Sequence, residues 1–331
     1  MNQRTHTWIA MRALALLEDE KECPRLVKLL KPYVKTAAIG SWIPDLADSK
    51  KGSGDIDNHV LKMKPYSGLG KERFVVNKKE LLKQLGNERL MSKFLKNDTS
   101  LKDDWWNKPY KAEPSPGQHL ANRTMALSVT ITDLLILGDR DVAKLVPRTV
   151  RFSENLDSDA RSHASQVATY FFMMTHFIAD SNMTCHCDAR KLAAYSSGLH
   201  HEMEGDWSKR IGTYFDKKKL FASDDSPNQI LKKVKTIDEK FDITFSKTVP
   251  PMKARDAWAE IIAISRGSFA VNSILVPPTT HPYSSKETTS FKDVFAGEEG
   301  KKLLSDINRI SIHDAVLNVA IIWKDIWKTF G

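Results

Sequence analysis

Apolar residues recur at helical spacing along most of this chain. The first stripe contains Trp8, Met11, Leu14 and Leu17, and similar patterns lie near residues 26–34, 125–137, 161–178, 256–273 and 306–327. Apolar positions three to four residues apart are typical of an amphipathic helix. Runs of alternating β-branched residues, which would indicate strands, are scarce, and no internal repeat is visible. The sequence therefore predicts an all-α fold.

Two polar stretches interrupt the helical pattern. Residues from about 65 to 117 are rich in lysine and end in a cluster of prolines and a glycine. Residues from about 215 to 253 are also rich in lysine and end at Pro250 and Pro251. We interpret both as surface excursions from a single domain that spans residues 1–331. Such runs of charge usually form a solvated face, and contact with lipid or nucleic acid is the alternative.

The composition is that of an ordinary globular protein. Of 331 residues, 41% are hydrophobic and 27% are charged, and lysine plus arginine outnumber aspartate plus glutamate by 50 to 41, which gives a net charge of +9. This surplus suits phosphate esters, acidic lipid surfaces and nucleic acid without choosing among them. The 3 cysteines are too few, and odd in number, for a disulfide framework. No apolar run is long enough for a membrane-spanning helix.

The strongest chemical signal is a pattern of histidines and carboxylates. His176 and Asp180 are four residues apart, so that they share one face of a predicted helix and can hold a metal ion between them. His200 and Glu204 repeat this spacing, and His186 lies between the two pairs, just beyond the expected end of the helix. One such pair alone would indicate a surface ion pair. Two pairs with a further histidine indicate a metal centre, and a mixture of imidazole and carboxylate suits zinc.

Three upstream residues complete the pattern. Asp45 ends the segment Gly-Ser-Trp-Ile-Pro-Asp, His59 follows 14 residues later, and His6 precedes the first helix. Together with the downstream pairs, this order and spacing resembles the zinc-dependent phospholipase C superfamily, which also includes fungal single-strand nucleases that release 5′-nucleotides. The resemblance covers the chain from His6 to Glu204. Beyond Glu204, the sequence resembles the family only in being rich in predicted helices.

The resemblance implies an all-α fold with three zinc ions in a cleft. The residues that match the family's ligands are Asp45, His59, His176 and Asp180 for the first ion, His186, His200 and Glu204 for the second, and Met1, His6 and the bridging Asp180 for the third. The third set uses the free α-amino group and carbonyl of residue 1. That residue is a tryptophan in the family and is Met1 here.

The same resemblance implies hydrolysis of a phosphate ester, with Asp45 as the catalytic residue that orients or deprotonates the attacking water. Two details favour the phospholipase branch: the last acidic ligand is Glu204, where the nucleases have aspartate, and the step from Asp45 to His59 has the phospholipase length. We therefore expect a zinc metallophospholipase C that releases diacylglycerol and a phosphorylated head group from a membrane surface, with no obligate protein partner. Leu46 stands where well-known members have a tyrosine, so head-group specificity and the substrate-binding residues stay open.

Two other functions stay open as alternatives. One is a zinc-dependent single-strand nuclease, which the net positive charge and the tandem Trp105 and Trp106 favour. The other is a non-catalytic membrane-binding zinc protein, although structural zinc is typically held in closed thiolate sites. The resemblance also implies a location outside the cytoplasm, whereas the N-terminus of this sequence shows no signal-peptide pattern.

Overall fold

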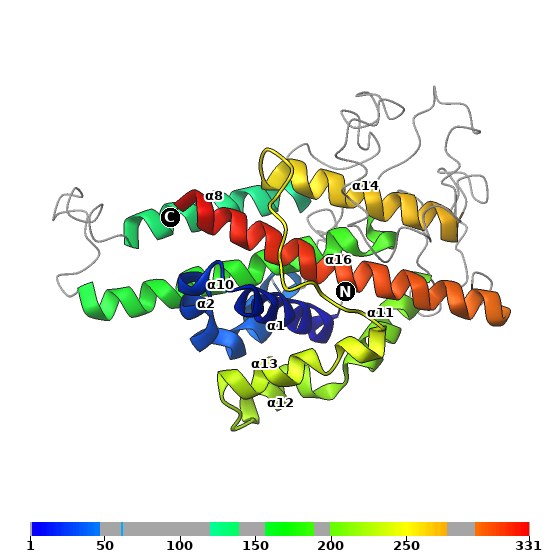
Figure 1. Ribbon diagram of the computed structural model, residues 1–331, viewed down its shortest axis with the longest axis horizontal. Helices are drawn as coiled ribbons and strands as arrows, with labels where there is room; N and C mark the ends of the chain where they lie inside the picture. Colours follow the sequence, from blue (N-terminus) through cyan, green and yellow to red (C-terminus); the bar gives the residue numbers. More distant parts are fainter. Residues whose placement is uncertain are drawn as a thin grey trace.

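The computed structural model describes residues 2–46, 61, 120–138, 156–188, 199–276 and 295–330. These residues form helices and contain no β-strand, which confirms the all-α prediction for this part of the chain (Figure 1). The long helices are α1 (Gln3–Glu20), α8 (Leu120–Gly138), α10 (Leu156–Asn182), α11 (Leu199–Ile211), α14 (Ala257–Leu275) and α16 (Gly297–Phe330). The short ones are α2 (Pro24–Leu30), η1 (Lys31–Thr36), α3 (Ala37–Gly40), η5 (Thr184–Cys187), η6 (Thr213–Phe215), α12 (Lys217–Ala222), α13 (Pro227–Lys235) and η7 (Asp238–Phe241).

Helix α1 lies at the centre of the molecule. The side chain of Asn2 accepts a hydrogen bond from the Thr5 amide and so caps the helix, which ends where Lys21 adopts a left-handed conformation. Every residue from Thr5 to Leu17 is buried. A helix that is buried on all sides must have neighbours all round it. In agreement, α1 packs against α16, α13, α3, α10 and α11.

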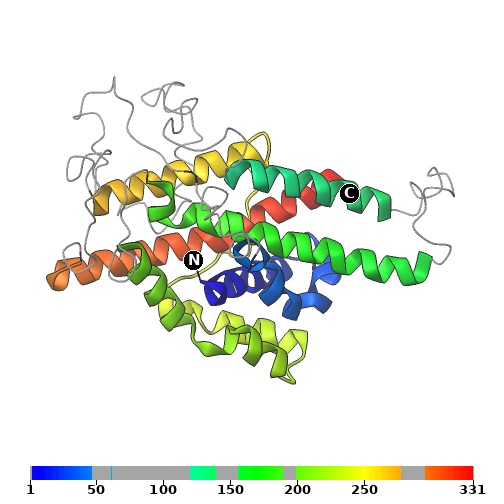
Figure 2. The same cartoon turned by 180° about the vertical axis from the view of Figure 1, so that it is seen from behind.

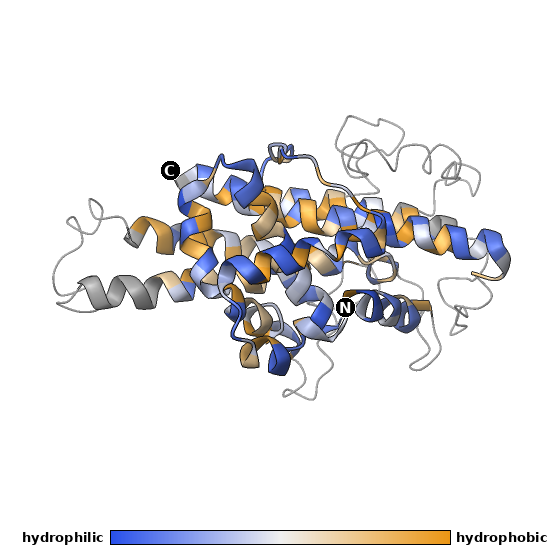
Figure 3. Ribbon diagram, turned by 60° about the horizontal axis from the view of Figure 1, so that its bottom comes forward, coloured by the Kyte–Doolittle hydropathy of each residue, from blue (hydrophilic) through white to orange (hydrophobic). Residues whose placement is uncertain are grey.

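Long helices cover α1 on one side. α10 packs against α8, α16 and α14, and α14 also contacts η5, which continues the chain from the end of α10 (Figures 1 and 2). Hydrophobic and hydrophilic residues are mixed along the helices, as expected of amphipathic helices (Figure 3). Trp323 of α16 contacts the rings of Phe171 and Phe172 of α10, with ring centroids 5.5 and 5.8 Å apart. These contacts fix α10, which carries the central part of the predicted metal site.

The short helices α2, η1 and α3 lead the chain back to α10. α3 packs against α10 at Gly40, where an added Cβ atom would lie 2.7 Å from Cβ of Phe172. Such a close approach is possible only for glycine. It brings the turn that begins at Ser41, and with it Asp45, beside α10.

The lysine-rich segment after α11 folds into the short helices α12 and α13 on the other side of α1. Ile230, Leu231 and Val234 of α13 are buried, and the indole of Trp8 donates a hydrogen bond to the Val234 carbonyl. The guanidinium of Arg12 pairs with the carboxylate of Asp238. The lysines of this segment are therefore carried by helices with a buried apolar side.

Several predicted features lie outside the described residues. They are Met1, His59, the polar stretch at about 65–117 and the tandem Trp105 and Trp106. Among the residues that the structure describes, no helix is both long and apolar enough to cross a membrane.

Candidate metal centre

Seven of the predicted ligands lie in five separate elements of the described chain. His6 was predicted to precede the first helix but lies inside α1, because Asn2 caps the helix and starts it at Gln3. The other ligands lie in a helical turn at residues 43–46 (Asp45), in α10 (His176 and Asp180), in η5 (His186) and in α11 (His200 and Glu204). The structure brings all these ligands together in two groups that are joined at Asp180.

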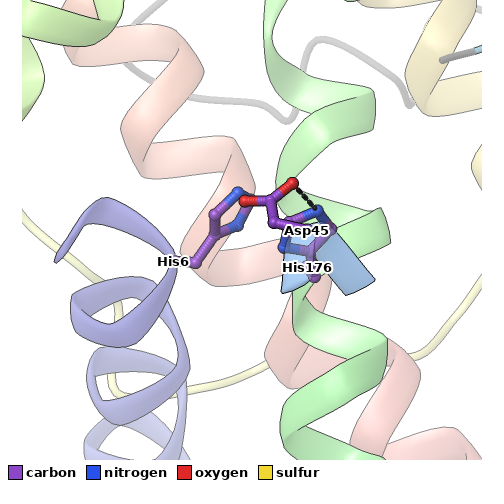
Figure 4. A group of neighbouring side chains, drawn as sticks. All are labelled: His6, Asp45 and His176. Atoms are coloured by element: carbon purple, nitrogen blue, oxygen red, sulfur yellow. Dashed lines mark ion pairs between the residues drawn. The ribbon is translucent and has the colours of Figure 1, made fainter. Parts of the chain in front are cut away.

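The first group contains His6, Asp45 and His176 (Figure 4). One ligand atom from each of these residues lies within 4.8 Å of the other two. Nε2 of His176 is 3.4 Å from Oδ1 of Asp45. The rings of His6 and His176 are stacked, with centroids 3.9 Å apart and planes 21° apart. One carboxylate and two imidazoles from three elements therefore meet at one point.

The second group contains His186, His200 and Glu204. Nε2 of His200 is 2.7 Å from Nε2 of His186 and 2.7 Å from Oε1 of Glu204, and Nε2 of His186 is 3.4 Å from the same oxygen. Ligands of a tetrahedral zinc ion lie about 3.3 Å from one another when each is about 2.0 Å from the metal. Two of the observed separations, at 2.7 Å, are shorter than this value, and the third, at 3.4 Å, is close to it.

Asp180 lies between the two groups. Its Oδ2 is 3.2 Å from Nε2 of His176, and its Oδ1 is 3.5 Å from Nε2 of His6 and 3.4 Å from Nδ1 of His186. Its side chain is almost completely buried. A carboxylate that faces three imidazoles with both oxygens has the geometry of a bridging ligand.

A backbone hydrogen bond fixes the orientation of His176. Its Nδ1 is 2.7 Å from the carbonyl oxygen of Ser41, which can only accept, so Nδ1 carries the proton and donates. In the neutral imidazole, Nε2 then carries the lone pair, and this lone pair faces the carboxylates of Asp45 and Asp180. A metal ion or a proton between this lone pair and the two carboxylates would satisfy all three groups. This arrangement, with a carbonyl behind a histidine, is common around metal-binding histidines.

Unsatisfied nitrogen atoms at the centre also fit a metal site. Nδ1 and Nε2 of His6 and Nδ1 of His186 are buried without a hydrogen-bond partner among the described residues. Buried polar atoms without partners are costly and rare in folded proteins. A metal ion would supply the missing partner for an imidazole nitrogen.

The protonation states of the centre also suit metal ligands. Burial lowers the pKa of His6 well below its usual range and that of His186 to about 4, so both imidazoles are neutral at pH 7. Burial alone would raise the pKa of Asp180, but the imidazoles of His176 and His186 help to hold it well below its usual range. The pKa of Glu204 is also low, because hydrogen bonds from His186 and His200 help to outweigh its burial. Neutral imidazoles and ionised carboxylates are the forms that bind a metal.

The centre is closed on one side and open on the other. His6 and Asp180 are inaccessible to solvent, whereas the side chain of Asp45 is 36% exposed and that of His200 is 29% exposed. Metal ions held here would therefore be accessible to a substrate from the side of Asp45 and His200.

The Ser41 carbonyl is a part of the centre that the residue pattern does not predict. A backbone group leaves no side-chain signal in the sequence. Gly40, which follows the predicted helix near residues 26–34, was the available hint, because glycine allows two segments to pack closely.

Comparison of the chain with protein-family models, with curated proteins and with solved structures finds no match. The two groups of histidine and carboxylate, each of which could hold a metal ion, are therefore the feature of the molecule that bears on its function.

Proposed function

We propose that this protein is a zinc-dependent phosphoric ester hydrolase that acts as a phospholipase C. One observation carries the proposal: two groups of histidine and carboxylate, which could each hold a metal ion, meet at the buried carboxylate of Asp180 and are open to solvent on one side. A closed site would serve structure alone, whereas an open site leaves room for a substrate and water.

The donor set favours zinc among the common metals. Imidazole with carboxylate, without thiolate, is the mixture found in catalytic zinc sites. Cys185 and Cys187 flank His186, but burial raises the pKa of both thiols, that of Cys187 to about 12. The thiol of Cys187 donates a hydrogen bond to the Ser181 carbonyl instead. The metal would thus be held by nitrogen and oxygen atoms of the two groups, with Asp180 between them.

When bound, zinc supplies Lewis-acid chemistry that neutralises the charge of a phosphate ester and acidifies water. The chain's own residues supply the remaining functions. Asp45 is the most exposed carboxylate of the centre and is placed to accept a proton from an attacking water. His6 and Asp180 close the opposite side against solvent, so that water reaches the phosphate from the side of Asp45.

The choice of phospholipid as substrate rests on the sequence resemblance. Glu204 is the last acidic residue of the pattern, where the nuclease branch has aspartate, and the 14-residue step from Asp45 to His59 has the phospholipase length. In the structure, Glu204 accepts a hydrogen bond of 2.7 Å from Nε2 of His200, a residue one helical turn earlier on α11.

A turnover assay of the zinc-loaded chain tests this function. Phosphatidylcholine and phosphatidylethanolamine vesicles are supplied in one reaction and a single-stranded oligonucleotide in another, each with and without a chelator. We expect release of phosphorylated head group that the chelator abolishes. Cleavage of the oligonucleotide alone would assign the protein to the nuclease branch, and absence of turnover with both substrates would overturn the proposal.

Two variants distinguish the centre from its surroundings. Asp180→Asn keeps the shape of the bridging side chain but removes its charge, and we expect activity to fall by more than about 100-fold, because even residues behind the ligands cost up to that much. His201→Ala removes a neighbouring histidine that is exposed and should leave activity unchanged. Full activity of Asp180→Asn would contradict the proposal.

A further inference from the structure

Helix α12 carries a cationic and apolar face at the edge of the molecule (Figure 1). Lys217, Lys218 and Lys219 are exposed, and the ring of Phe221 is 44% exposed. Lys217 and Lys218 are four and three residues before Phe221, so all three side chains share one side of the helix. Phe221 is the one exposed phenylalanine among the described residues, and it lies beside positive charge.

The positive charge of this face is not neutralised by its neighbours. Of the nearby aspartates, Asp216 pairs with Arg4 over 2.7 Å and Asp225 pairs with Lys233 over 2.6 Å. In the part of the chain that the structure describes, no carboxylate forms an ion pair with Lys217 or Lys218. Their charges are therefore available to an anionic partner.

The face is held rigidly on the body of the protein. Leu220, on the opposite side of α12, is completely buried. At one end of the helix Asp216 binds the side chain of Arg4 in α1, and at the other Lys35 donates a hydrogen bond to the Ser223 carbonyl. α12 also contacts α3, which leads to Asp45. A partner bound to this face would thus be held near the elements that carry the metal centre.

We propose that the exposed face of α12, formed by Lys217, Lys218 and Phe221, docks on an anionic phospholipid surface. Lysines beside an exposed aromatic ring suit the membrane interface, because the ring enters the boundary between head groups and acyl chains while the ammonium groups stay at the phosphates. Nucleic acid is less well matched, since sequence-tolerant binding of single strands uses several aromatic rings along a basic groove and this face has one. This docking face is independent of what the metal centre hydrolyses.

Cosedimentation of the full chain with vesicles tests the docking face. The vesicles contain either phosphatidylcholine alone or phosphatidylcholine with phosphatidylserine, and binding is measured at low and high salt. We expect the chain to bind the anionic vesicles more tightly, and salt to weaken that binding. Each lysine near an anionic surface contributes roughly fivefold to partitioning, so Lys217→Gln with Lys218→Gln should weaken binding roughly 30-fold. Phe221→Ser should weaken it roughly tenfold, through lost apolar contact.

A matched control distinguishes the effect of this face from the effect of lowering the net charge of the chain. Lys301→Gln with Lys302→Gln removes the same charge from exposed positions of α16 and should leave vesicle binding unchanged. Three results would overturn docking through α12. They are failure of the wild-type chain to bind anionic vesicles, equal losses in the α12 and α16 variants, and α12 variants that bind vesicles normally but lose binding to a single-stranded oligonucleotide. All the substituted side chains are exposed, and circular dichroism verifies that each variant is folded.

Discussion

Nδ1 of His176 donates a hydrogen bond to the Ser41 carbonyl over 2.7 Å, and this contact ties α10 to the turn that carries Asp45. It directs the other nitrogen of the ring toward Asp45 and Asp180. The position of Ser41 depends in turn on Gly40, which allows α3 to lie against Phe172. The packing of two helices thus sets the orientation of a ligand side chain.

The first prediction concerns this packing. Gly40→Ala places a Cβ atom 2.7 Å from Cβ of Phe172 and 3.1 Å from the Thr169 carbonyl oxygen, and neither atom is at the flexible end of a side chain. We expect the free energy of unfolding to fall by about 1–3 kcal/mol, as is typical of overpacking. Urea unfolding measures the change. Zinc binding should weaken as well, because Ser41 would shift away from His176.

Gly205→Ala is the matched control. Gly205 is an exposed position inside α11, where an added Cβ atom meets nothing within 4 Å. Alanine is favoured over glycine in a helix by about 1 kcal/mol, so this variant should be as stable as the wild type or more stable. If both variants were destabilised equally, the close contact between α3 and α10 would not be the cause.

The helical pairs of the centre could be predicted from sequence because they depend only on the helical period. His176 and Asp180, and likewise His200 and Glu204, are four residues apart and lie on one face of a helix whatever the tertiary structure. The meeting of His6 with His176 is different. These residues are far apart in sequence, and only the packing of α1 on α10 brings their rings together. The resemblance implies only that His6 and His176 serve different ions that share Asp180, so the stacking of the two rings was not predicted.

The lysine-rich segment shows why other parts were not predicted. Ser226 and Gln229 form a capping box at the start of α13, Pro227 is its first residue, and both signals are visible in the sequence. The many lysines around it suggested a solvated excursion. The buried side of α13 packs on α1, and such packing cannot be inferred from a helix of only 9 residues.

A second prediction concerns a buried ion pair that links α16 to the end of α1. Lys324 is 3% exposed, pairs with the buried carboxylate of Glu20 and donates to the Val249 carbonyl over 2.8 Å. Lys324→Met keeps the apolar stem but leaves Glu20 without its cation, so we expect stability to fall by about 3 kcal/mol in urea unfolding. Lys301→Met, at an exposed pair, should change it by less than about 1 kcal/mol. Similar effects of the two substitutions would refute the role of Lys324.

A second carboxylate that pairs with Lys324, that of Glu22, predicts a dependence on pH. A hydrogen bond from Lys324 lowers the pKa of Glu22 below that of a free glutamate. A lowered carboxyl pKa contributes stability that is complete above the unfolded-state pKa and is lost as the pH falls through the folded-state pKa. The stability difference between wild type and Lys324→Met should therefore narrow in acid. Urea unfolding from neutral pH down to about 3 measures it, and a constant difference would contradict the linkage.

A third prediction concerns the cysteines. Cys23, Cys185 and Cys187 are all buried free thiols, and burial raises the pKa of each. Because the thiolate is the reactive form, none should react with a disulfide reagent in the native chain at neutral pH. All 3 should react after unfolding in guanidinium. A thiol that reacts rapidly in the native protein would show that the burial around η5 or the end of α1 is wrong.

A fourth prediction separates the two metal groups. His200→Ala removes a ligand of the second group but leaves the first group intact, so the chain should lose one equivalent of bound zinc and keep the other. His201→Ala changes the adjacent, exposed histidine and should lose none. Equilibrium dialysis followed by elemental analysis gives the stoichiometry. Loss of zinc from both variants alike would mean that the assignment of ligands on α11 is incorrect.

The most direct test of the metal centre is the zinc stoichiometry of the wild-type chain. The protein is stripped with a chelator, dialysed and titrated with zinc in a calorimeter, beside His176→Ala. We predict that the wild type binds at least one ion in each of the two groups, and that His176→Ala loses the ion held with His6 and Asp45. A wild-type chain that binds no zinc, or a variant that binds as much zinc as the wild type, would contradict the account.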